Sequence, residues 1–169
     1  FTCSGTITLT AEIVITADTT IDGGGQAVTI SGNNAVRVFK VNSGITLSLD
    51  ELTVVDASTP VYPDDYGGGI YSLGTVEVSN STFAGNSAGA GGGIYNDHNA
   101  RLTVSNSTFF SNSTRRIAGN GGGIYNNDNA ILTVSNSTFF GNSAIGYGGG
   151  IHNNFGMLAV INSTFSANS

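Results

Sequence analysis

The sequence predicts an all-β fold, a parallel β-helix (β-solenoid) of about six coils with three short strands in each. Three observations lead to this prediction: the composition, a repeated glycine-led unit, and short segments of alternating apolar residues. Gly, Asn, Ser and Thr supply 82 of the 169 residues, and all four disfavour helix interiors. Because 39% of the residues are still hydrophobic, the chain needs a core, and a turn-rich β fold meets both conditions.

A unit that opens with three glycines occurs four times between residues 67 and 169. In each unit a valine is followed five residues later by a phenylalanine, and three residues after that by an asparagine. Length changes fall only between these blocks, as a solenoid requires, because its strands stack in register while its loops vary. The four sets are Val78, Phe83 and Asn86; Val104, Phe109 and Asn112; Val134, Phe139 and Asn142; and Val160, Phe165 and Asn168.

Each unit holds three short β-prone segments, such as residues 93–95, 102–104 and 107–109. Alternation with a period of two places Ile94, Leu102 and Phe109 inside the coil and Tyr95 and Thr108 outside. The residue between the second and third segments is Asn80, Asn106, Asn136 or Asn162, and asparagine tolerates the left-handed conformation of a sharp turn. We expect these asparagines to hydrogen-bond to one another along the axis.

The chain is expected to form one continuous solenoid in two parts. Residues 1–66 contain seven alternating segments, enough for about two irregular N-terminal coils, and residues 67–169 contain the four repeats. Neither end shows a capping helix or a charged lid, so we expect unpaired strand edges there and contacts between copies, head to tail.

Charge and hydropathy exclude several classes of partner. The net charge is −6 and the chain has a single lysine, which argues against nucleic acid. No apolar run approaches the roughly 20 residues of a membrane span. Cys3 has no second cysteine to pair with, and the chain is expected to be a mature or trimmed piece of a longer protein.

The pairing of Gly-Gly-Gly-Ile with Phe-x-x-Asn resembles the GGA[ILV] and FxxN tetrapeptides of polymorphic outer membrane protein repeats. The segment TIDGGG at residues 20–25 is similar to the first coils of bacterial extracellular β-helix proteins of the pectate-lyase-like class. The resemblance covers residues 67–169 strongly and residues 1–66 loosely. It implies a right-handed β-helix at a bacterial cell surface or released from it, often as an adhesin. This sequence departs from the pattern in having glycine where the first tetrapeptide has alanine.

An aromatic column is the first candidate binding surface. Tyr71, Tyr95, Tyr125 and His152 follow the core isoleucine in successive units, so they should stack on one outer face. Such a column suits sugar rings, and it is equally suited to being a stack that only supports itself. Tyr62 and Tyr66 lie in a long loop nearby and are further ligand candidates.

Two long loops form the second candidate site. They leave the same corner two coils apart, one carrying Asp64 and Asp65 and the other Arg115 and Arg116. If the chain is an enzyme, these are its candidate catalytic residues, with a carboxylate as base and an arginine holding a uronate sugar. The alternative is a solvated surface ion pair of little energetic value.

Weaker candidates concern metal and modification. His98 should lie beside Asp128, and Asp97 beside Asn127, on adjacent coils. These residues could form an acid-base pair or a weak calcium site, or they could simply be solvated turn residues. No other cofactor is predicted. Five Asn-Ser-Thr triplets match the N-glycosylation pattern, at Asn80, Asn106, Asn112, Asn136 and Asn162.

Two functions follow from these observations. The preferred one is a non-catalytic extracellular or cell-surface scaffold and adhesion module that self-assembles end to end into filaments. The alternative is a β-helix that binds or cleaves polysaccharide, as a lyase or a glycoside hydrolase. Whether such an enzyme would retain or invert configuration depends on the separation of its carboxylates, which a sequence does not give.

Overall fold

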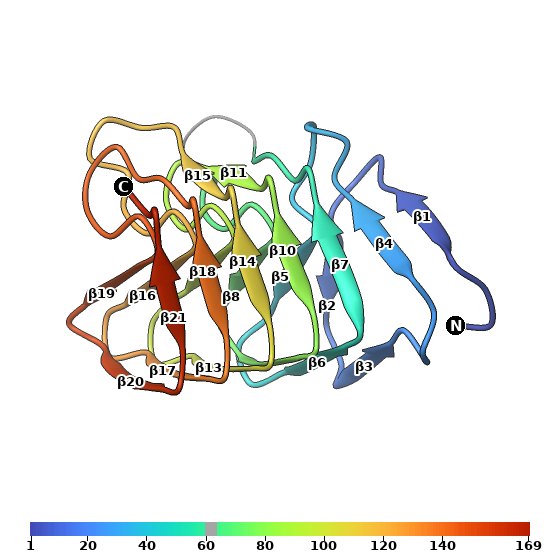
Figure 1. Cartoon of the computed structure of the whole chain (residues 1–169). Helices are drawn as coiled ribbons and strands as arrows, with labels where there is room; N and C mark the ends of the chain where they lie inside the picture. Colours follow the sequence, from blue (N-terminus) through green and yellow to red (C-terminus); the bar gives the residue numbers. More distant parts are fainter. Residues whose placement is uncertain (60–63) are drawn as a thin grey trace.

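The computed structural model describes residues 1–59 and 64–169, and it confirms the all-β prediction. The described residues form 21 strands and no helix. Every strand pair is parallel, and each strand pairs with the corresponding strand of the next coil. The result is a right-handed parallel β-solenoid of about six turns (Figure 1).

Three long sheets run along the solenoid, and a short fourth sheet joins two loops. Sheet A contains β1 (Gly5–Thr8), β4 (Val28–Ser31), β7 (Leu52–Val55), β10 (Thr82–Ala84), β14 (Thr108–Phe110), β18 (Thr138–Phe140) and β21 (Thr164–Ser166). Sheet B contains β2 (Ile13–Ile15), β5 (Phe39–Val41), β8 (Ile70–Ser72), β12 (Ile94–Asn96), β16 (Ile124–Asn127) and β19 (Ile151–Asn154). Sheet C contains β3 (Thr19–Asp22), β6 (Thr46–Asp50), β9 (Thr75–Ser79), β13 (Arg101–Ser105), β17 (Ile131–Ser135) and β20 (Met157–Ile161). The short sheet pairs β11 (Ser87–Ala88) with β15 (Ser113–Thr114).

The core consists of columns of apolar side chains, and in the repeat region one column is made of phenylalanines alone. Phe83, Phe109 and Phe139 are 0% exposed. Their ring centroids are 4.9 and 4.8 Å apart, and consecutive rings are tilted by only 4° and 7°. The phenylalanine column confirms that the coils stack in the register predicted from the fixed valine-phenylalanine spacing.

The glycine triplets allow the coils to approach closely at one corner. Gly91 has φ = +64°, in the left-handed region, where glycine carries no penalty. A Cβ atom on Gly92 would collide with the backbone of Ser113 and of Gly122 in the next coil. A larger residue at Gly92 would therefore push two coils apart.

The asparagine turn is confirmed, but the prediction that these asparagines hydrogen-bond to one another is wrong. Asn80, Asn106, Asn136 and Asn162 have φ between +47° and +49°, and this conformation leaves them exposed at the corner before sheet A. The asparagine ladder forms instead from the residues of the FxxN motif, which are buried at the opposite end of the sheet A strands. Asn112 donates from Nδ2 to Asn142 Oδ1 at 2.9 Å, and its own Oδ1 accepts from the backbone N–H of Asn86 at 3.1 Å.

The last coil leaves part of its inward column uncovered. Leu158, Val160 and Phe165 are 40%, 43% and 42% exposed, whereas Leu132, Val134 and Phe139 in the preceding coil are fully buried. In the part of the chain that the structure describes, no helix is long and apolar enough to cross a membrane.

Candidate functional site

The aromatic column lies on the outer face of sheet B, as the repeat predicts. Tyr71, Tyr95, Tyr125 and His152 are the second residues of β8, β12, β16 and β19 and pair in register. Successive ring centroids are 5.8, 4.8 and 5.0 Å apart. The column is therefore continuous over four coils.

The expectation that Tyr95 is an exposed member of this column is wrong, because its side chain is only 6% exposed. The end of the 58–66 loop folds back over the face, and the Tyr66 ring lies 4.8 Å from Tyr95 and 6.2 Å from Tyr71. Tyr66, Tyr71, Tyr125 and His152 are half-buried. Tyr62 lies outside the described residues.

A hollow of about 280 Å³ opens beside the column. Tyr66, Tyr95 and Tyr125 form its aromatic side, and residues 116–120 of the second long loop form the other. Burial raises the pKa of Tyr95 and, together with the nearby Asp97 carboxylate, that of Tyr71. Burial lowers the pKa of His152, so the column carries neutral hydroxyls and a neutral imidazole at pH 7.

The two long loops contact each other through Asp65 and Arg116, as predicted. The other two residues of the predicted site, Asp64 and Arg115, have different partners. Arg116 Nη1 lies 3.2 Å from Asp65 Oδ1. Asp65 is buried, whereas the Arg116 side chain is 44% exposed, so the pair joins a buried carboxylate to a guanidinium at the surface. Arg115 does not face a carboxylate; it donates to the Ser58 hydroxyl at 2.9 Å and to the Thr59 carbonyl at 2.8 Å.

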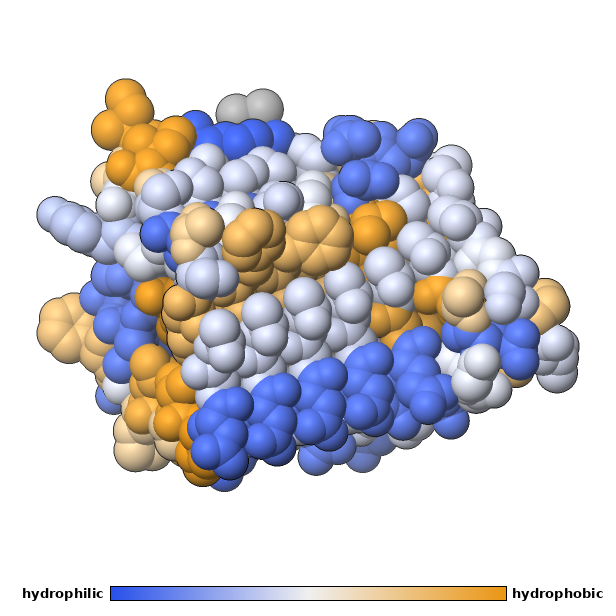
Figure 2. Space-filling view, viewed as in Figure 1, coloured by the Kyte–Doolittle hydropathy of each residue, from blue (hydrophilic) through white to orange (hydrophobic). Residues whose placement is uncertain are grey.

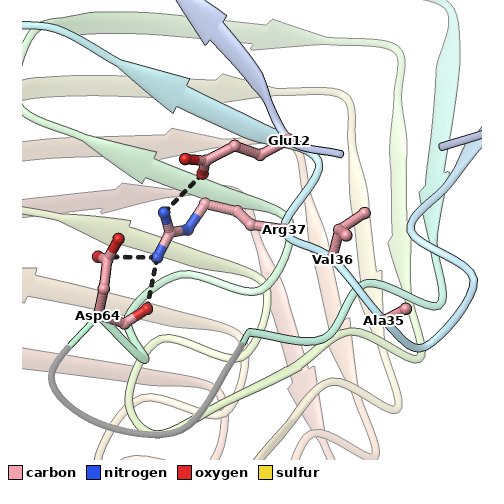
Figure 3. Close-up of a pocket in the computed structure, with 5 residues that line it drawn as sticks. All are labelled: Glu12, Ala35, Val36, Arg37 and Asp64. Atoms are coloured by element: carbon pink, nitrogen blue, oxygen red, sulfur yellow. Dashed lines mark hydrogen bonds and ion pairs between the residues drawn. The ribbon is translucent and has the colours of Figure 1, made fainter. Parts of the chain in front are cut away.

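Asp64 turns away from both loop arginines and binds Arg37, a residue that sequence reasoning missed (Figure 3). The Arg37 side chain is 2% exposed and lies 2.7 Å from Glu12 Oε2 and 3.1 Å from Asp64 Oδ1. It also donates to the carbonyls of Asp64, Tyr66 and Gly67. Arg37 therefore fixes the end of the loop that carries Tyr66.

The signal for Arg37 is hidden in the irregular N-terminal coils. Phe39 pairs with Ile70, so Arg37 stands where Gly68, the second glycine of a triplet, stands one coil later. The one glycine triplet of residues 1–66, at 23–25, follows a sheet C strand and does not precede a sheet B strand. An alignment of coils by sequence therefore does not reveal that a charged residue occupies a glycine position.

The Asp97 neighbourhood is assembled as the repeat predicts. His98 Nδ1 lies 2.6 Å from Asp128 Oδ2, and Asn127 donates to Asp97 Oδ1 at 2.9 Å. Tyr71 donates to the other oxygen of Asp97 at 3.0 Å. Both carboxylate oxygens of Asp97 thus hold neighbouring coils together. Residues 1–59 and 64–169 contain no group of three or more His, Cys, Asp or Glu side chains placed to hold a metal ion.

Exposed apolar loop tips beside the tyrosine column were also missed. Ile117, Ile145 and Tyr147 are 94%, 58% and 72% exposed. The two loops that carry them are joined by a hydrogen bond from Gly146 N–H to the Gly119 carbonyl. Sequence reasoning did not find these residues because they lie in the joints whose length and composition vary between units.

Comparison with known proteins confirms the resemblance of the repeats. Residues 80–97, 106–127 and 136–154 match the Chlamydia polymorphic membrane protein repeat, and each segment begins at an exposed turn asparagine and ends just after the core isoleucine. Among solved structures, jun a 1, the major allergen from cedar pollen, is similar at 17% identity and a TM-score of 0.37. That similarity covers 100% of this chain and 70% of the other. No curated protein matches the sequence.

Proposed function

We propose that the chain is a non-catalytic scaffold and adhesion module of the cell surface, and that it binds glycan through the outer face of sheet B. The matched repeat is one of polymorphic membrane proteins, which supports a place at the surface. The observation that carries the binding proposal is the set of five aromatic rings on this face, Tyr66, Tyr71, Tyr95, Tyr125 and His152, together with the hollow beside them.

The physical properties of this face suit recognition. Tyrosine gives a large contact area with little loss of side-chain entropy, and its hydroxyl bonds to polar partners. Stacking between coils and contacts such as that of Tyr71 with Asp97 hold the rings in place before a ligand arrives. A polysaccharide chain along the solenoid axis would meet the half-buried rings of the face and not Tyr95, which is buried. The half-buried rings are Tyr66, Tyr71, Tyr125 and His152.

Replacement of Tyr125 by alanine is expected to weaken glycan binding about tenfold or more, which corresponds to ~1.4 kcal/mol, because Tyr125 lines both the column and the hollow. The protein, immobilised on beads, is incubated with polygalacturonate, chitooligosaccharides and heparan sulfate, and depletion of each from solution is measured. Phe140→Ala is the matched control, since Phe140 is an aromatic residue that is 52% exposed on sheet A. Equal binding by the two variants would contradict the proposed face.

Polysaccharide cleavage is the second candidate function, and the contact between Asp65 and Arg116 is the observation in its favour. This pair lies at the edge of the hollow, since Arg116 is one of the lining residues. Two observations favour the non-catalytic function instead. The Asp65 carboxylate is buried in an ion pair, and Asp64 is bound to Arg37.

End-to-end association belongs to the same proposal. In the 169-residue chain Leu158, Val160 and Phe165 are exposed, whereas the equivalent residues of the other repeats are buried against the next coil. A second copy of this chain would supply a coil to cover them. The molar mass from light scattering is expected to rise with protein concentration above the 17.2 kDa of one chain, and Val160→Lys is expected to reduce the rise. A constant 17.2 kDa at all concentrations would overturn this part of the proposal.

A further inference from the structure

We propose that the corner of the solenoid before sheet A is a row of N-glycosylation sites, at Asn106, Asn136 and Asn162. The observation that points to it is the way the fold separates the five Asn-Ser-Thr triplets. Four of them stand at this corner, one per coil, and the fifth, at Asn112, does not. Figure 2 shows a row of hydrophilic residues along the edge of the face that sheet A forms.

The corner asparagines present their side chains to solvent. The left-handed conformation at these positions turns the side chain outward, and all four residues are exposed. Asn80 donates from Nδ2 to Asp50 Oδ1 at 2.8 Å. For Asn106, Asn136 and Asn162, the described residues provide no partner to the side-chain amide, so these three amides are free to react.

The other two residues of each triplet are also suitably arranged. The middle serine fixes the turn, as Ser107 does by donating from Oγ to the Ser105 carbonyl at 2.7 Å. The third residue, Thr108 in this triplet, opens a strand of sheet A with its side chain on the outer face. The triplet thus combines an exposed asparagine with a threonine that is not buried, the two residues that the glycosylation pattern requires.

Asn112 has the same triplet and the opposite environment. It is 0% exposed, and its Nδ2 donates to the Phe83 carbonyl and to Asn142 Oδ1, both at 2.9 Å. An enzyme cannot reach this amide without separating two coils. Asn112 therefore serves as an internal control, because it carries the same triplet as the corner asparagines but its amide is buried.

The turn itself does not demand asparagine. Thr82 pairs with Thr53, which places Asn80 opposite Glu51, and Glu51 builds the same turn with φ = +53°. Asparagine suits the left-handed turn but is not the only residue that can form it, and its exposed amide is available for a role outside the fold.

The reaction is the transfer of one glycosyl group from a nucleotide sugar. A bond forms between asparagine Nδ2 and the anomeric carbon of the sugar, the bond between that carbon and the phosphate oxygen breaks, and the nucleoside diphosphate leaves. The amide loses one proton to solvent, and no oxidant or reductant is involved. Adjacent corners are about 4.8 Å apart, so we expect single sugars, since large glycans on neighbouring coils would collide.

The test uses the whole 169-residue chain, folded and made in a cell without asparagine glycosylation. It is incubated with UDP-glucose and a soluble asparagine glycosyltransferase that recognises Asn-x-Ser/Thr, and peptide mass spectrometry locates the hexose. We expect modification at Asn106, Asn136 and Asn162 at least tenfold above that at Asn112, with less at Asn80. Thr108→Val should remove the modification at Asn106 alone.

A synthetic peptide of residues 109–116 shows whether the Asn112 triplet is a competent substrate outside the fold. Modification of this peptide, but not of Asn112 in the folded chain, supports the proposal. Modification of Asn112 in the folded chain to the same extent as Asn106, or no hexose on any corner asparagine while the peptide reacts, would overturn it.

Discussion

Replacing Arg37 with methionine is expected to lower the free energy of unfolding by about 3 kcal/mol or more, measured by denaturant titration. Methionine keeps much of the volume of the side chain and removes every donor. The carbonyls of Asp64, Tyr66 and Gly67 then lose their hydrogen bonds from the buried guanidinium. Because these residues end the loop that covers Tyr95, the exposure of Tyr95 should also rise.

Arg101→Met is the matched control for this experiment. Arg101 begins β13 and its side chain is exposed, so the free energy of unfolding should change by no more than about 0.5 kcal/mol. If Arg37→Met were as stable as Arg101→Met, water would be replacing the hydrogen bonds of Arg37, and its role in holding the loop would be refuted.

Phe109→Ala is expected to cost about 3–5 kcal/mol of unfolding free energy, because Phe109 is fully buried between two stacked rings. The cavity would lie in the middle of the column, where the register of the coils above and below prevents collapse. Thermal or denaturant unfolding followed by circular dichroism measures the loss.

The adjacent residue gives the control for the core. Phe110 follows Phe109 in β14 but points to solvent and is 40% exposed, so Phe110→Ala should cost less than about 1 kcal/mol. A similar cost for both variants would mean that the inside and outside of β14 are assigned wrongly.

The repeat region was predictable from its sequence because one physical rule governs it. Stacking in register places like residues on like residues, so the spacing of Val104, Phe109 and Asn112 within a unit also predicts the columns of the core. The same rule placed Tyr71, Tyr95 and Tyr125 in a column and His98 beside Asp128.

The features that the sequence did not predict are those that stacking in register does not determine. The burial of Tyr95 depends on the position of Tyr66, at the end of a long joint that has no equivalent of the same length in the next coil. The partner of Asp64 is Arg37, and no glycine triplet precedes the sheet B strand that follows Arg37, so the sequence did not align it with Gly68. The asparagine ladder formed at the FxxN corner because φ at the other corner turns the side chain outward, and periodicity alone does not report φ.

The measurement that tests the proposed function most directly is calorimetric titration of the protein with the glycan it retains best, followed by sizing of the recovered glycan. We expect saturable binding that Tyr125→Ala weakens about tenfold and Phe140→Ala leaves unchanged, with the glycan recovered at its original length. Shortened glycan would contradict the non-catalytic function by showing cleavage. Binding that is unaffected by Tyr125→Ala would contradict it by placing the ligand on another face.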